Sequence, residues 1–172
     1  MMYEEVIRDF AERTRANLRA IERLQSEGGR VYEITQLVNS TLGLLVFPQQ
    51  KYVNQIPHLP LEQLEQHGWP IPKIRGDFRQ VSDLNQLVRY LRNAIAHFNI
   101  QFIGDGQNQI CLLRVWNTDP RSRRKTWEAE LSVDDLRKIS NRFIDLLLNE
   151  HNQKIKTDET DGSAARKTPT SL

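Results

Sequence analysis

The sequence is poor in cysteine and contains no long apolar run. Its 172 residues include one cysteine, Cys111, so neither a disulfide framework nor a multi-cysteine metal site is expected. Cys111 lies in an apolar run, where a small buried hydrophobe is the favoured interpretation and a catalytic thiol the minor one. The longest apolar stretch, residues 42–47, is far too short to span a bilayer. The acidic N-terminus is not typical of a signal peptide, so we expect a cytoplasmic protein with no membrane contact.

The sequence also lacks a large net charge. Its 24 basic and 22 acidic residues give a formal charge of +2, so any nucleic-acid binding must come from local clusters of cations. Hydrophobic residues make up 38% of the chain, which is enough to bury a core. We expect one domain over residues 1–151. Residues 152–172 are polar and rich in Lys, Thr, Ser and Asp, which predicts a disordered tail.

Hydrophobic periodicity predicts four long helices. The first three span residues 3–26, 31–47 and 84–98, and the fourth begins after Ser132, which forms a variant capping box with Asp135. Asp83 is in the N-cap position of the third helix. Residues 39–41 interrupt the second helix with polar side chains that need partners, so we expect them to face a neighbouring helix or a cleft. Residues 48–81 are rich in proline and predict an irregular segment with one short helix near 61–67.

Between the third and fourth long helices the pattern changes to that of strands. Residues 99–103 and 109–116 flank a glycine-containing turn and predict a β-hairpin, and residues 126–131 predict a third strand. The fold class that we expect is therefore mainly α. It is a helical bundle of four long helices plus short ones, with a small antiparallel sheet at about 99–131 before the last helix.

The third long helix carries the most suggestive chemistry of the chain. Its apolar stripe leaves Arg89, Arg92, Asn93 and His97 on the other side, with Arg92 and His97 roughly 140° apart around the axis. Arginine is a fixed cation suited to phosphate, and histidine can transfer a proton near neutral pH. Among the four histidines only His97 has an arginine five residues before it. The alternative is a solvated arginine and a histidine that is favoured by the dipole at a helix C-terminus.

A second candidate site is the loop between the predicted second and third strands. It holds four cations in five residues, Arg121, Arg123, Arg124 and Lys125, beside two tryptophans. Such a cluster is suited to the phosphate backbone of RNA. The alternative is a loop that is charged only to stay solvated.

The motif of Arg92, Asn93 and His97 on a bundle helix resembles that of the HEPN superfamily. Members carry an arginine, commonly followed by Asn, Asp or His, and then a histidine a few residues later. The sequence of residues 32–39, 44–50, 89–98 and 125–131 is similar to that of a bacterial, often plasmid-borne branch described as HEPN-family nucleases. The resemblance covers about residues 10–150. The hairpin and extra strand depart from the plain helical bundle of the superfamily, which puts substrate access and dimer geometry in question.

The resemblance implies a metal-independent endoribonuclease without a cofactor. It also implies a homodimer in which two motif helices form one composite site, a toxic or defensive role, and control by an antitoxin or regulatory protein. Chemistry gives a matching hypothesis for RNA cleavage by the 2′-hydroxyl. His97 would be the base, Arg92 would hold the phosphate, Asn93 would orient His97 or the substrate, and Arg89 with the basic loop would bind RNA.

One chain supplies a single such histidine, so the acid would be His97 of the second subunit. The products would be a 2′,3′-cyclic phosphate and a 5′-hydroxyl. The alternative function is a catalytically silent module that binds RNA, a nucleotide or a partner protein. The sequence does not identify the RNA, its preferred bases or any antitoxin.

Overall fold

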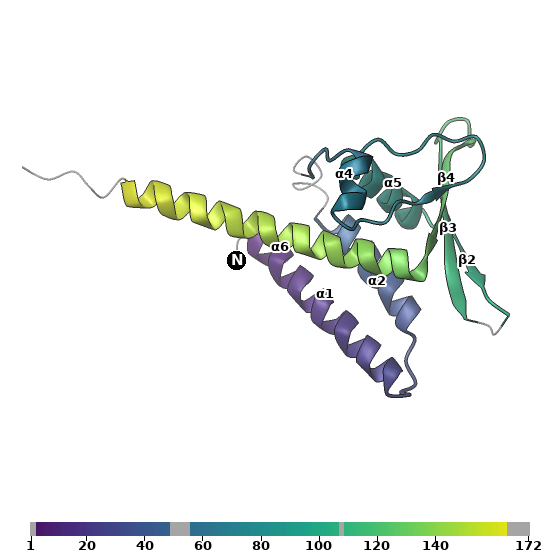
Figure 1. Cartoon of the computed structure of the whole chain (residues 1–172), viewed down its shortest axis with the longest axis horizontal. Helices are drawn as coiled ribbons and strands as arrows, with labels where there is room; N and C mark the ends of the chain where they lie inside the picture. Colours follow the sequence, from purple (N-terminus) through teal and green to yellow (C-terminus); the bar gives the residue numbers. More distant parts are fainter. Residues whose placement is uncertain (1–2, 49–55, 107–108, 165–172) are drawn as a thin grey trace, which may run out of the picture.

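Five helices and a four-stranded antiparallel sheet make up the part of the chain that the computed structural model describes, residues 3–48, 56–106 and 109–164. Their order is α1 (Tyr3–Ser26), α2 (Glu33–Val46), α4 (Leu61–Gln66), β1 (Lys73–Ile74), α5 (Leu84–Ala96), β2 (Ile100–Gly104), β3 (Ile110–Thr118), β4 (Lys125–Ser132) and α6 (Val133–Ala164). Figure 1 shows the sheet at one end of the molecule, with the long helices α1 and α6 leading away from it. No described helix is long and apolar enough to cross a membrane.

Helices α1, α2 and α6 pack against one another, and polar side chains fix two of their contacts. The buried hydroxyls of Thr41 and Ser140 lie 2.6 Å apart and join α2 to α6. An ion pair between Arg15 and Asp145 joins α1 to α6. The polar interruption of α2 thus has the expected outcome, because Thr41 faces a neighbouring helix and Asn39 lines a groove described below.

The sheet has the strand order β1-β4-β3-β2, and its inner face covers α5. Along the long β3–β4 pair, Leu113 lies opposite Leu131 and Val115 opposite Ala129, and all four side chains are buried. The alternate residues form the outer face, where Arg114 donates two hydrogen bonds to Glu130. This alternation of buried and polar residues is the pattern that predicted β3 and β4 from sequence.

The fold is mixed rather than mainly α, which corrects the expectation from sequence. Helices account for 53% of the chain, and the sheet has a fourth strand. That strand, β1, is two residues long and pairs with β4 through Lys73 and Glu130. It was missed because two residues in a proline-rich segment are too few for an alternating pattern. The four long helices are present, but α5 packs against α2 and β3, so the sheet forms one side of its surroundings.

Helix α6 is longer than its apolar pattern indicates. It continues to Ala164, past Asn152 where the composition predicts a disordered tail, and Figure 1 shows its end projecting beyond α1. The prediction relied on the absence of apolar residues to bury. A helix that is already nucleated can be extended through polar residues at little cost, because each added residue gains a backbone hydrogen bond without a new nucleation step. Residues 165–172 lie outside the described part.

The position of α5 follows from its amphipathic sequence and its N-cap. Six side chains of its apolar face are buried, namely those of Leu84, Leu87, Val88, Leu91, Ala94 and Ile95. The helix begins after Asp83, whose carboxylate accepts a hydrogen bond from the backbone N–H of Gln86 at 2.8 Å and another from His58 at 2.9 Å. Burial raises the pKa of Asp83, but the hydrogen bonds from His58 and Gln86 outweigh it and lower this pKa from 3.8.

We predict that Asp83→Ala lowers the free energy of unfolding by about 1 kcal/mol, because a first-turn N–H of α5 loses its acceptor. Asp83→Asn retains an acceptor and should cost clearly less. Since the pKa of Asp83 is lowered in the folded state, its contribution is present above pH 3.8 and is lost as the pH falls through the lowered pKa. Urea denaturation of both variants tests this, and equal losses for Ala and Asn would contradict the assignment of the cap.

Candidate functional site

A cleft of about 910 Å³ lies between the exposed side of α5 and the loop that joins β3 to β4. Helix α5 contributes Arg89 and Asn93, and His97 directly follows its last residue. Because these three are four residues apart, they lie in one row along the helix. The other lining residues are Tyr90, Asn99, Asn117, Thr118, Asp119, Pro120, Arg123 and Thr126. The cleft therefore combines a histidine, two arginines and several neutral polar groups.

His97 occupies the C-cap of α5 with an exposed side chain. Its backbone N–H donates to the carbonyl oxygen of Asn93 at 3.1 Å, which fixes the main chain. In residues 3–48, 56–106 and 109–164 no hydrogen bond or ion pair engages the imidazole ring. The main chain of His97 is thus fixed at the cleft, and its ring is exposed to solvent.

Arg92 is not brought into the cleft with His97. It is partly buried on the neighbouring side of the helix, and it is absent from the residues that line the cleft. At about 100° per residue, Arg92 lies on the far side of Arg89 from His97. The structure therefore places Asn93 and Arg89 with His97 in the cleft lining, whereas Arg92 does not line the cleft.

The β3–β4 loop is shaped by Asp119. Its carboxylate accepts hydrogen bonds from the backbone N–H groups of Ser122 at 2.6 Å and of Arg121 at 3.0 Å, an arrangement typical of Asx turns. The hydrogen bonds from Ser122 lower the pKa of Asp119, so this carboxylate is an acceptor rather than an acid at neutral pH. The turn places Arg123 in a left-handed conformation with φ +59°, and Arg123 lines the cleft.

The other three cations of this loop lie outside the cleft. Lys125 forms an ion pair with Glu128 and stands over the ring of Trp116 at 4.8 Å, on the opposite face of the sheet. The side chains of Arg121 and Arg124 are exposed to solvent. Of the predicted RNA-binding residues, the structure therefore groups Arg89 and Arg123 with His97.

The floor of the cleft contains residues that the sequence analysis missed. The ring of Tyr90 packs against the ring of the buried Trp127, with 5.2 Å between their centroids. The guanidinium of Arg89 lies over the same Tyr90 ring, 5.8 Å from its centroid. Asn117 is buried and donates its side-chain N–H to the carbonyl oxygen of Tyr90 at 3.3 Å. Asn117 interrupts the inward-facing apolar series of β3 with a polar group, and that interruption was the signal that could have identified it.

Phe98 is a further residue that sequence reasoning missed. It is 83% exposed and has a φ of +58°, a conformation that is uncommon for a bulky side chain. The conformation is fixed by backbone hydrogen bonds from Phe98 to Ile95 and from Asn99 to Ala94, which end α5. Phe98 and Arg123 are the two non-glycine residues with positive φ in the described ranges, and both adjoin His97 or its cleft. Such strained residues tend to gather at functional sites.

Comparison with known proteins supports one family. The family model described as HEPN pEK499 p136 matches residues 1–154, which include the whole cleft. No curated protein and no solved structure matches the chain.

We predict that Phe98→Gly raises the free energy of unfolding by about 0.5–1 kcal/mol, because glycine adopts positive φ without strain and the exposed ring buries little surface. Phe98→Ala should give no gain, since its Cβ keeps the strain. Urea denaturation of both variants measures the difference. A loss of stability in Phe98→Gly would mean that the ring contributes to folding, contrary to its exposure.

Proposed function

The chain belongs to the HEPN pEK499 p136 family, a plasmid-associated branch of a superfamily that generally implies nuclease or nucleotide-binding function, and we propose that it is a metal-independent endoribonuclease with His97 as its proton-transfer residue. The observation that carries this proposal is the cleft, which the row of Arg89, Asn93 and His97 lines together with Arg123 of the β3–β4 loop. A proton carrier beside fixed cations suits an RNA phosphate, which needs both.

The proposed reaction is an attack of the 2′-hydroxyl on its own phosphate. His97 takes the proton of this hydroxyl, a bond forms between the 2′-oxygen and phosphorus, and the bond to the 5′-oxygen breaks as that oxygen receives a proton from an acid. The guanidinium groups of Arg89 and Arg123 stabilise the negative charge that develops on the phosphate oxygens. The products are a 2′,3′-cyclic phosphate and a 5′-hydroxyl. DNA lacks the internal nucleophile and is not a substrate.

The need for an acid that protonates the leaving 5′-oxygen is the reason to propose a homodimer. Asp119 lines the same cleft, but its pKa is lowered by the hydrogen bonds from Ser122, so it is a poor proton donor at neutral pH. His97 of a second copy is the simplest source of the proton. In this arrangement Arg92, which does not line the cleft of its own chain, contacts the partner or the phosphate held at the partner's cleft.

A catalytically silent module that binds RNA or a nucleotide is the second candidate function. The observation in its favour is that, in the described part of the chain, His97 is the single histidine at the cleft. A cleft with two arginines and one histidine holds a phosphate whether or not a second subunit completes it. A toxic or defensive role under an antitoxin or regulatory partner is a further proposal, and it rests on the family alone.

We predict that the wild-type protein cleaves single-stranded RNA in EDTA and leaves 2′,3′-cyclic phosphate ends. His97→Ala should lower the rate by about 10²- to 10⁴-fold, the usual value of a well-placed acid–base group. His67→Ala is the matched control, because His67 is also exposed but does not line the cleft. Product ends are identified with a phosphatase, which removes a terminal phosphate only after the 2′,3′-cyclic ring has been opened.

The mass of each variant in solution completes that experiment. Equal loss of activity in both histidine variants, or activity that EDTA removes, would contradict the proposed mechanism. A folded wild-type dimer that binds RNA but does not cleave it would support the silent module instead.

The two neighbouring arginines of the loop provide a test of the cleft itself. Arg123 lines the cleft and Arg124 does not, although both are exposed cations in the same turn. We predict that Arg123→Ala weakens RNA binding about 10- to 100-fold, as expected for one charged hydrogen bond to phosphate, and that Arg124→Ala has little effect. Binding is measured at one fixed salt concentration. Equal effects of the two substitutions would mean that the loop attracts RNA through its overall charge and that Arg123 makes no specific contact in the cleft.

A further inference from the structure

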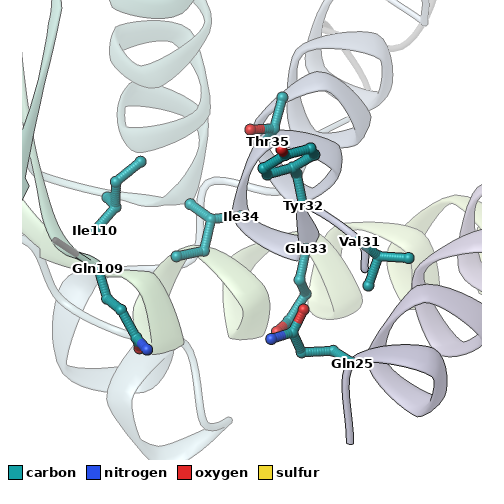
Figure 2. Close-up of a pocket in the computed structure, with 8 residues that line it drawn as sticks. All are labelled: Gln25, Val31, Tyr32, Glu33, Ile34, Thr35, Gln109 and Ile110. Atoms are coloured by element: carbon teal, nitrogen blue, oxygen red, sulfur yellow. The ribbon is translucent and has the colours of Figure 1, made fainter. Parts of the chain in front are cut away.

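An apolar groove lies on the other side of the α5 C-terminus from the cleft. Its volume is about 390 Å³, and it runs between α2 and strands β2 and β3. It is lined by Ile34, Thr35, Val38, Asn39, Leu42, Ile95, Phe98, Ile100, Phe102 and Ile110. The groove continues into a smaller pocket of about 270 Å³, with which it shares Ile34, Thr35 and Ile110. Figure 2 shows this pocket, where Ile34 of α2 projects toward Ile110 of β3 and Tyr32 stands beside Thr35.

The groove is joined to the catalytic cleft by one peptide bond. His97 lines the cleft and Phe98 lines the groove, and their Cα atoms are about 3.8 Å apart, as across any trans peptide. A nucleotide has the same form, with a charged phosphate and an apolar, planar base a few ångströms away. A phosphate at His97 therefore places a base of the same strand within reach of Phe98.

The side chains around the groove match the chemistry of a base. The rings of Phe98 and Phe102 are 83% and 43% exposed, so each offers surface on which a base can stack. Asn39 and Thr35 are exposed on α2 at the same groove, and an asparagine amide carries both a donor and an acceptor for a base edge. Apolar faces with a polar edge are what a nucleobase needs.

The size of the groove suits a base. Its volume of about 390 Å³ lies within the ordinary range of sites for small ligands.

We propose that this groove binds a nucleobase of the RNA, stacked on Phe98, next to the phosphate held at His97. The positive φ of Phe98 fits this proposal, because it accompanies an exposed ring that lines the groove at the end of the catalytic helix. This inference rests on the proposed function, since it assumes that RNA occupies the cleft.

The test compares two fluorescent oligomers that the protein cannot cleave, a 2′-O-methyl oligoadenosine and an abasic oligomer of the same length and charge. Wild-type protein should bind the first about 10- to 100-fold more tightly, the usual range for stacking on an aromatic ring. Phe98→Gly should remove this difference and leave the abasic affinity unchanged, because the phosphate contacts remain. Phe47→Ala is the matched control, since Phe47 is a 45% exposed aromatic residue that lines neither the groove nor the smaller pocket.

Three outcomes would overturn the inference. The first is that Phe98→Gly still discriminates between the oligomers. The second is that wild-type protein binds neither. The third is that Phe98→Gly weakens both oligomers alike and changes the mass in solution, which would assign the ring to an interface between copies. Cleavage of unmodified RNA, measured in parallel, separates this inference from the proposed function. If the protein discriminates between the oligomers but does not cleave RNA, the base site is supported and the ribonuclease function is rejected. If it cleaves RNA but does not discriminate, the ribonuclease function is supported and the base site is rejected.

Discussion

The burial of one face of α5 is the constraint on which the rest of the structure depends. Six apolar side chains of this helix are enclosed between α2 and the inner face of the sheet, so its orientation about its own axis is fixed. Because the helix has one buried side, the row of Arg89, Asn93 and His97 is forced to the surface beside the β3–β4 loop. The chain then passes through His97, Phe98 and Asn99 into β2, so three residues separate the helix from the sheet at the candidate site.

The sheet gives this chain a site that a plain helical bundle would not form. The long β3–β4 pair carries its connecting loop to the end of α5, and the Asx turn of Asp119 directs Arg123 toward His97. One of the two arginines that line the cleft with His97 therefore comes from a part of the sequence well separated from the Arg92 motif. The two ends of α5 contribute differently to function. Its N-cap at Asp83 anchors the helix, and its strained C-terminus presents His97 and Phe98.

Two surfaces of opposite character meet at the end of α5, and together they match the two halves of a nucleotide. The cleft is polar and holds two arginines, whereas the groove is apolar and is bordered by Phe98 and Phe102. The strain at Phe98 opposes stability, because glycine would be favoured at that position. In the proposed function, the base site at this groove and the phosphate site in the cleft would be parts of one RNA-binding surface.

The sequence by itself determined the local elements. It located α1 and α5, the hairpin of β2 and β3, the caps at Asp83 and Ser132, and the resemblance to the family, because periodicity, capping and motifs act within a few residues. Only the tertiary structure decided that β1 joins the sheet, that Arg123 rather than Arg92 lines the cleft with His97, and that an apolar groove opens at Phe98. These features depend on contacts between segments far apart in the chain and on backbone angles set by packing, and neither leaves a periodic signal in the sequence.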